Sequence, residues 1–134
     1  MTEHVKVRVR DVMTSNYVII DGLTTVKEGI QMARSHEVKA LVVDKRNDDD
    51  EYGVVLMNDI AKKVLAQNRS PERTNIYEIM TKPALSVDPN MNVKYCARLF
   101  ERFGISRAPV IEQGKVIGMV SYNNIVINGM VKDD

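Results

Sequence analysis

Two segments of this 134-residue chain carry residue types at a spacing that suits nucleotide binding. Residues 53–60 (GVVLMNDI) and 118–125 (GMVSYNNI) each read as a glycine-led apolar strand that runs into a helix. At the helix start, Asp59 or Asn124 could hydrogen-bond the hydroxyls of a ribose. Ser121 could direct its hydroxyl to a phosphate, which the N-terminal end of the helix dipole would also attract.

Each segment matches this nucleotide-binding pattern only in part. The first has Asp59 but carries Leu56 where the hydroxyl should stand. The second has Ser121, but its Asn124 lacks the charge assistance of a carboxylate. Helix capping explains Asp59 and Asn124 without any ligand, because both residue types are favoured caps. Ligand binding and capping therefore both stay open for these positions.

The chain contains the same order of segments twice. The tetrapeptide DVMT at 11–14 recurs as EIMT at 78–81, and further similar segments follow each copy before the closing strand. A period this long indicates two copies of one supersecondary unit. We expect the copies to pack on each other, since neither can bury its apolar face alone. The cleft between them is then the natural ligand site.

Together, the DVMT-like opener, the segment GISRAPV at 104–110 and the two closing strands resemble a tandem pair of CBS domains. The resemblance covers residues 9–131. It implies an α+β fold of two pseudo-symmetric β-α-β-β-α units packed through their sheets. We place the first repeat at 9–66, a polar linker at 67–76 and the second repeat at 77–131.

The resemblance implies a non-catalytic regulatory module that senses an adenosine-containing ligand between the repeats and signals to a partner protein. AMP fits the charge count best, because only Lys39, Arg107 and Arg46 are placed to meet phosphates. The residues before Pro109 would line the adenine, and the strand after each opener would pack on it. The predicted ligand set is Val18, Ile19, Lys39, Leu41, Asn58, Asp59, Leu85, Val87, Ser106, Arg107, Ala108, Pro109, Ser121, Asn123 and Asn124.

Each of these assignments has a plainer alternative. Lys39 and Arg107 could be solvated side chains at a strand start, as most lysines and arginines are. Val18, Ile19 and their counterparts in the second repeat could be ordinary core residues. A CBS pair that binds no ligand and acts as a homodimeric scaffold is the competing function.

Composition excludes several other functions. A net charge of +1 argues against nucleic-acid or membrane binding driven by bulk charge. No apolar run approaches the roughly 20 residues that span a bilayer. The single cysteine, Cys96, cannot form an internal disulfide, which together with the polar N-terminus predicts a cytoplasmic protein. No residue spacing supports a catalytic constellation or a metal site, and the acidic residues at 48–59 depart from a calcium loop at two ligand positions.

Several local features are predicted as well. Val5, Val7 and Val9 alternate with basic residues and predict an N-terminal strand. Helices should begin at Thr24 or Thr25 and at Asn92. Their buried stripes should be Val26, Ile30 and Ala33 in the first, and Val93, Ala97, Phe100 and Phe103 in the second. The residues 112–115 predict a tight hairpin turn, and 46–51 a solvated acidic loop.

Overall fold

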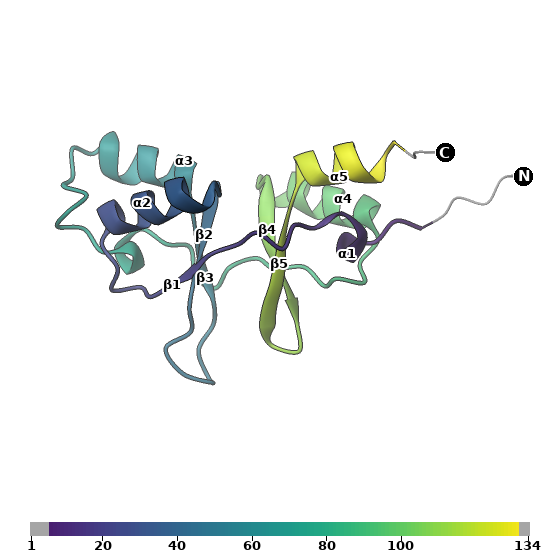
Figure 1. Cartoon of the computed structure of the whole chain (residues 1–134), viewed down its shortest axis with the longest axis horizontal. Helices are drawn as coiled ribbons and strands as arrows, with labels where there is room; N and C mark the ends of the chain where they lie inside the picture. The colour runs from purple at the N-terminus through teal and green to yellow at the C-terminus, as the bar shows by residue number, and fades with distance from the viewer. Residues whose placement is uncertain (1–5, 132–134) are drawn as a thin grey trace, which may run out of the picture. The chain divides into compact units, whose positions relative to one another are not determined.

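The computed structural model describes residues 6–131 and divides them into two compact units (Figure 1). The continuous unit comprises residues 16–84. The split unit combines the described residues up to Ser15 with those from Leu85 onward. This division differs from the repeat in the sequence, because the opening tetrapeptide of each repeat lies in the unit that holds the closing strand of the other. Each unit is therefore built from parts of both repeats.

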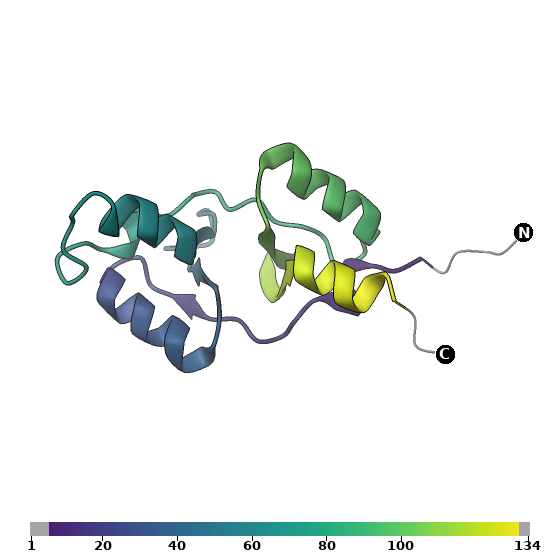
Figure 2. The ribbon, with the colours of Figure 1, turned by 90° about the horizontal axis from the view of Figure 1, so that it is seen from above.

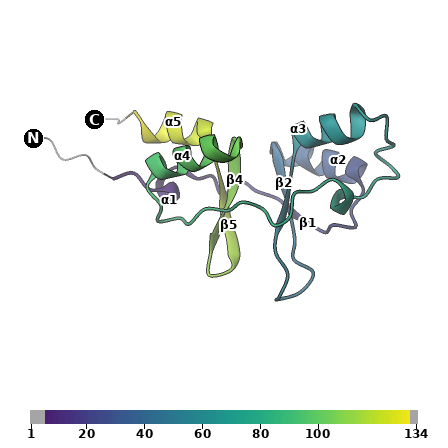
Figure 3. The ribbon, with the colours of Figure 1, turned by 180° about the vertical axis from the view of Figure 1, so that it is seen from behind.

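The continuous unit is a three-stranded sheet with helices on one side, as Figure 3 shows for α2 and α3. Its elements in chain order are β1 (Ile19–Ile20), α2 (Val26–His36), β2 (Ala40–Val43), β3 (Gly53–Leu56), α3 (Met57–Ile60), a π-helical segment (Ala61–Leu65) and a 3-10 turn (Ile76–Glu78). Strand β1 is parallel to β2, and β2 is antiparallel to β3. The β-α-β-β-α order predicted from the sequence is confirmed.

The central strand and its crossover helix have clear local causes. All four residues of β2 are apolar and buried, a continuous apolar run typical of a central strand. Helix α2 begins at Thr25, whose hydroxyl accepts a hydrogen bond from the Glu28 amide at 3.1 Å while the Glu28 carboxylate accepts one from the Thr25 amide at 3.1 Å. This reciprocal capping box satisfies two amides that a helix start leaves unpaired.

The split unit has the same order with a weaker first strand. Its elements are α1 (Val9–Val12), α4 (Val93–Phe103), β4 (Arg107–Glu112), β5 (Lys115–Ser121) and α5 (Tyr122–Gly129). Strands β4 and β5 form an antiparallel hairpin, and Val87 adds a single parallel bridge to Val110 where the first unit has β1. Figure 2 shows α4 and α5 side by side. Asn92 caps α4 through a 2.8 Å hydrogen bond from the Lys94 amide, as predicted.

The predicted hairpin turn is also confirmed. Glu112 pairs with Lys115, and the two residues between them have positive φ angles, 52° at Gln113 and 77° at Gly114. Two successive left-handed residues match the twist of the flanking strands.

Each opening tetrapeptide crosses the glycine of a closing strand. In the split unit, Thr14 pairs with Met119, and a Cβ at Gly118 would lie 2.8 Å from the Thr14 carbonyl oxygen and 2.9 Å from Met13 Sδ. In the continuous unit, Thr81 pairs with Val54, and a Cβ at Gly53 would lie 2.8 Å from Met80 Sδ. The two glycines therefore permit the close approach that extends each sheet by one bridge.

The predicted N-terminal strand is wrong. Val9 begins α1, and Val5 lies outside the described residues. Val7 packs against the split-unit core, and its carbonyl accepts a hydrogen bond from the Val93 amide at 2.9 Å. An alternating pattern forms a strand only where a neighbouring strand can pair with it. Residues 6–9 make one such pairing, the bridge between Arg8 and Asn92.

The predicted buried stripes of the two long helices are partly wrong. Ile30 and Phe103 are exposed, whereas Gly29 and Cys96 are buried. Val26, Ala33 and Phe100 are buried as predicted, and Val93 and Ala97 are half-buried. Burial raises the pKa of the Cys96 thiol to about 11.

The polar segment at 67–76 is packed within the continuous unit. Thr74 is buried and its carbonyl accepts a hydrogen bond from Val26 at 2.8 Å, while Ile76 is fully buried in the core. Between residues 6 and 131, the structure contains no helix long and apolar enough to cross a membrane.

Candidate strand-to-helix ligand sites

The first candidate site is the turn between β3 and α3. Asp59 is half-buried, and its Oδ2 accepts a hydrogen bond from the Leu56 amide at 3.0 Å. The amide of Met57 donates to the carbonyl of Lys39, at the start of the neighbouring strand, at 3.2 Å. The side chain of Leu56 has no polar group, so the polar side chains of this turn are those of Asp59 and exposed Asn58.

The second candidate site is the corresponding turn between β5 and α5. Ser121 is 7% exposed, and its hydroxyl accepts from the Asn124 amide at 3.1 Å and lies 3.0 Å from Asn124 Oδ1. Asn124 Oδ1 also accepts from the Ser121 amide at 3.1 Å. Ser121 and Asn124 thus form a complete capping box. Capping occupies the polar atoms on which the nucleotide prediction depends.

Arg107 is the cation nearest to the second turn in the strand register. It pairs with Ser121 across the β4–β5 hairpin, while the carbonyl of Ser106 accepts from Tyr122 at 3.0 Å. Partial burial lowers the pKa of the Arg107 guanidinium. Among the described residues it makes no ion pair or hydrogen bond, which leaves a desolvated cation beside the start of α5.

The continuous unit places its cation differently. Ala40 pairs with Leu56 and so occupies the position of Arg107, while Lys39 precedes the strand and is exposed. Arg46 lies beyond the opposite end of β2, where its Nε is 3.2 Å from Asp50 Oδ2. The prediction that Arg46 contributes to the same phosphate site as Lys39 is therefore wrong, because the two residues lie at opposite ends of β2.

The apolar members of the predicted set are mostly core residues. Val18 and Leu41 belong to the core of the continuous unit, and Val87 and Ala108 to that of the split unit. Pro109 is also buried. Exposed positions in the predicted set are Ile19, Lys39, Asn58, Ser106 and Asn123. Leu85 is half-buried against the split-unit core.

A cavity of about 720 Å³ in the continuous unit was missed by the sequence reasoning. It lies where β1 and β2 end, and its lining includes Asp21, Lys45 and Lys82. Arg46, one of the three cations counted for the phosphate, lines the cavity, but no other residue predicted to meet the ligand does. Two features of the sequence could have indicated a charged site here. They are Lys82, directly after the second opening tetrapeptide, and the acidic residues of the loop at 46–51.

A model of the CBS domain matches residues 9–66 and 76–128. The chain belongs to the CBS-domain family. Its two CBS repeats account for most of its length, and the mixed helix and strand fold of both units agrees with that assignment.

Similar proteins support the same conclusion. The CBS domain-containing protein YhcV of Bacillus subtilis (strain 168) is 27% identical over 91% of this chain and 85% of its own. The hexameric CBS-CP12 protein from bloom-forming cyanobacteria is 35% identical, with a TM-score of 0.90 over 92% of this chain and 68% of that one. The CBS domain pair of the protein MJ0100, solved with 5′-methylthioadenosine and S-adenosyl-L-methionine, shares the fold at 23% identity, with a TM-score of 0.79 over 91% of this chain and 94% of that one.

Proposed function

We propose that this CBS pair is a non-catalytic regulatory module that binds an adenosine-containing ligand, with AMP preferred, and signals to a partner protein. The observation that carries the proposal is Arg107. A guanidinium that is partly desolvated and has no partner in residues 6–131 favours an anionic ligand, because burying an unpaired charge is costly. It stands opposite Ser121 in the hairpin register, beside the positive end of the α5 dipole.

In this proposal the second turn binds the phosphate. Arg107 and the start of α5 attract the phosphate oxygens, and Asn124 faces the ribose from its half-buried position. Exposed neighbours at Ser106 and Asn123 complete the polar surroundings. The adenine would meet the backbone near Ala108 and Pro109, since the side chains of both are buried, and pack on Leu85 beside buried Val87.

The first turn would bind AMP mainly through its ribose. Asp59 and exposed Asn58 can bond ribose hydroxyls, but Leu56 offers no hydroxyl and Arg46 lies at the other end of β2. Lys39, whose carbonyl accepts a hydrogen bond from the Met57 amide, is a cation close to this turn. The backbone at Leu41 and the strand at Val18 and Ile19 would meet the base. Few cations at either turn make a monophosphate a better match than a triphosphate.

A ligand-free homodimeric scaffold is the second candidate. It is favoured by the capping bonds themselves, because Asp59, Ser121 and Asn124 each have a structural role without a ligand. Both candidates leave the chain without catalytic residues of its own. The single buried cysteine fits the reducing cytoplasm proposed for either.

Calorimetric titration with AMP tests the ligand proposal residue by residue. Asp59→Ala, Ser121→Ala and Arg107→Met should each weaken binding by about 1–3 kcal/mol, because each removes a bond to the ligand from a partly desolvated site. The matched control is Thr25→Ala, which removes a cap of the same kind from α2. It should cost stability and leave the affinity unchanged.

The control separates the two roles of the capping residues. Equal affinity of all three site variants and the parent would overturn the assignments. A loss in Thr25→Ala as large as that in Ser121→Ala would show that destabilisation, not ligand contact, explains the effect.

A further inference from the structure

The cavity of the continuous unit lies at the opposite end of the sheet from Asp59. Parallel strands β1 and β2 both end at the cavity, at Ile20 and Val43, whereas β3 ends at the Asp59 turn. Its volume of about 720 Å³ lies within the range of small-molecule sites, roughly 300–1,000 Å³. All of its lining residues belong to this one unit. Any ligand bound there is thus separate from the proposed nucleotide.

A partly buried ion pair lies beside the cavity and includes Lys82, which lines it. Lys82 Nζ lies 2.7 Å from the carboxylate of Asp50, whose side chain is only 9% exposed. The same carboxylate accepts from the Arg46 amide at 2.8 Å and from Arg46 Nε at 3.2 Å. Asp50 therefore neutralises Lys82 and fixes the loop that carries Arg46, instead of being the solvated acid that the sequence predicted.

The remaining charged side chains of the lining include acids and bases, and each keeps atoms that could bind a ligand. Asp21 and Asp44 follow paired residues of β1 and β2, so they leave adjacent strands at the same level. In each, Oδ1 accepts from a backbone amide, at 2.7 Å and 2.8 Å, while Oδ2 makes no hydrogen bond with the described residues. Lys45 Nζ rests 4.9 Å from the centre of the Tyr52 ring, and the Arg46 terminal nitrogens make no ion pair within residues 6–131.

Solvent-exposed apolar side chains lie next to these charged residues in the lining. Leu23 is 72% exposed and Tyr77 is 50% exposed, although both border the cavity. Met80 and the buried Val43 complete the apolar part of the lining. A carboxylate pair, a cation pair and an apolar wall within one cavity can together satisfy an ammonium group, a carboxylate and a hydrocarbon side chain.

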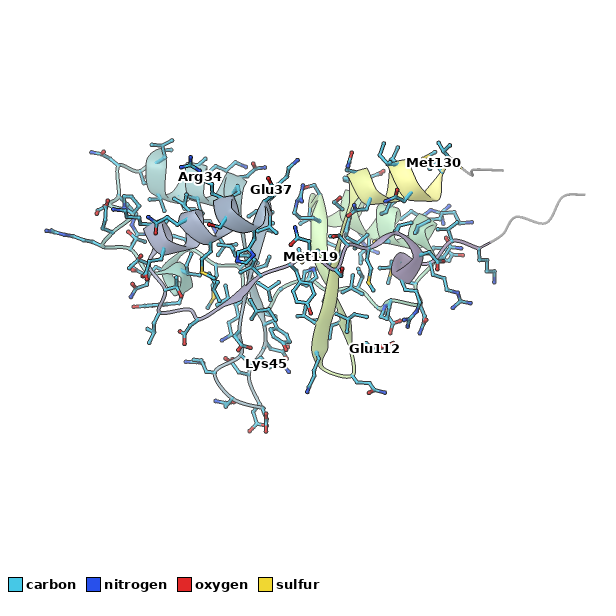
Figure 4. The ribbon with its side chains drawn as sticks, viewed as in Figure 1. Arg34, Glu37, Lys45, Glu112, Met119 and Met130 are labelled. Carbon is cyan, nitrogen blue, oxygen red and sulfur yellow. The ribbon has the colours of Figure 1, made fainter. Side chains whose placement is uncertain are left out.

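We propose that this cavity binds a zwitterionic α-amino compound with an apolar side chain, either a free amino acid or a short peptide. Its ammonium group meets Asp21 and Asp44, its carboxylate meets Lys45 and Arg46, and its side chain covers Leu23 and Tyr77. Figure 4 labels Lys45 at the start of the loop that carries these cations. The balanced charges select against compounds that carry one charge alone.

Calorimetry and thermal shift on the full chain test the proposal with leucine, methionine and phenylalanine at up to about 10 mM. N-acetyl-leucine and leucinamide, which each lack one charge, serve as matched ligands, and Leu-Leu tests the peptide source. Asp44→Asn and Lys45→Met should weaken the binding of the amino acid or peptide about tenfold or more, since each removes a charged partner but keeps the side-chain size. Tighter binding of Leu-Leu than of leucine assigns the peptide, and the reverse assigns the amino acid.

Two control variants show whether the zwitterion binds in the cavity or elsewhere on the protein. Asp48→Asn alters an exposed carboxylate of the same loop outside the lining, and Asp59→Ala alters the proposed nucleotide site. Both should keep full affinity for the zwitterion, which also separates this proposal from the AMP proposal. No binding of any zwitterion, equal binding of the singly charged analogues, or unchanged affinity in Asp44→Asn and Lys45→Met would each overturn it.

Discussion

Asp50 has a different role in the structure from the one that the sequence predicts. In the sequence it is one of several acids in a polar loop, and a solvated turn is the natural interpretation. In the structure, the hydrogen bond from Lys82, helped by the Arg46 amide, lowers the pKa of the Asp50 carboxyl far below its ordinary value. The partner lies 32 residues further along the chain, a separation that no local pattern reveals.

A pH-dependent loss of stability follows from this pair. Because the pKa of Asp50 is lowered by folding, its contribution is complete above the ordinary aspartate pKa of about 4 and is lost as the pH falls below that value. Urea unfolding should therefore show that Asp50→Asn is destabilised relative to the parent at pH 7, with a difference that shrinks in more acidic buffer. The exposed control, Asp48→Asn, should match the parent at pH 7. A difference for Asp50→Asn that grows on acidification would contradict the assignment.

At the scale of elements, close backbone crossings fix how each opener docks. The sequence predicts the two long helices, a cap at Thr24 or Thr25 for the first and at Asn92 for the second, and the hairpin turn, because these depend on neighbours within a few residues. The structure places the first cap at Thr25. The sequence does not predict the bridge from Thr14 to Met119, which joins segments about a hundred residues apart. Gly118 was noted only as a strand start, although its missing side chain is what lets that bridge form.

Gly118→Ala should destabilise the protein by about 1–3 kcal/mol, since the new Cβ would meet the Thr14 carbonyl oxygen at 2.8 Å. Chemical denaturation measures the change. Gly129→Ala is the control, because its Cβ would lie at ordinary contact distance, 3.4 Å, from Val12. It should be neutral or slightly stabilising within a helix. Similar losses in both variants would count against a specific crossing at Gly118.

At the scale of the whole molecule, an apolar stretch on α5 and beyond points to self-association. Ile127 is 61% exposed, and Val126, Met130 and Val131 are exposed with it. In the sequence, the homodimer is predicted from the family resemblance alone. The sequence does not locate the contact surface, because the apolar pattern of a helix does not show which of its residues stay exposed after the unit has folded. We expect these residues to form the contact between copies.

We expect the parent chain to be a dimer in light scattering coupled to size exclusion, and Ile127→Glu to be a monomer, because this change places a charge in the proposed apolar contact. Asn47→Glu adds the same charge on the loop at 46–51 and should leave the mass unchanged. A parent that is monomeric at all concentrations would exclude this surface as a dimer contact, as would an Ile127→Glu variant with the mass of the dimer.

A thermal-shift screen can show whether this CBS pair senses an adenosyl compound, as we propose. The purified chain is heated with AMP, ADP, ATP, NADH or S-adenosylmethionine, each at about 1 mM, and a compound that binds only the folded state must raise the melting temperature. We predict a dose-dependent rise that is largest with AMP and reduced in Arg107→Met. No shift with any of the five compounds would contradict the claim and leave the ligand-free scaffold as the account of this protein.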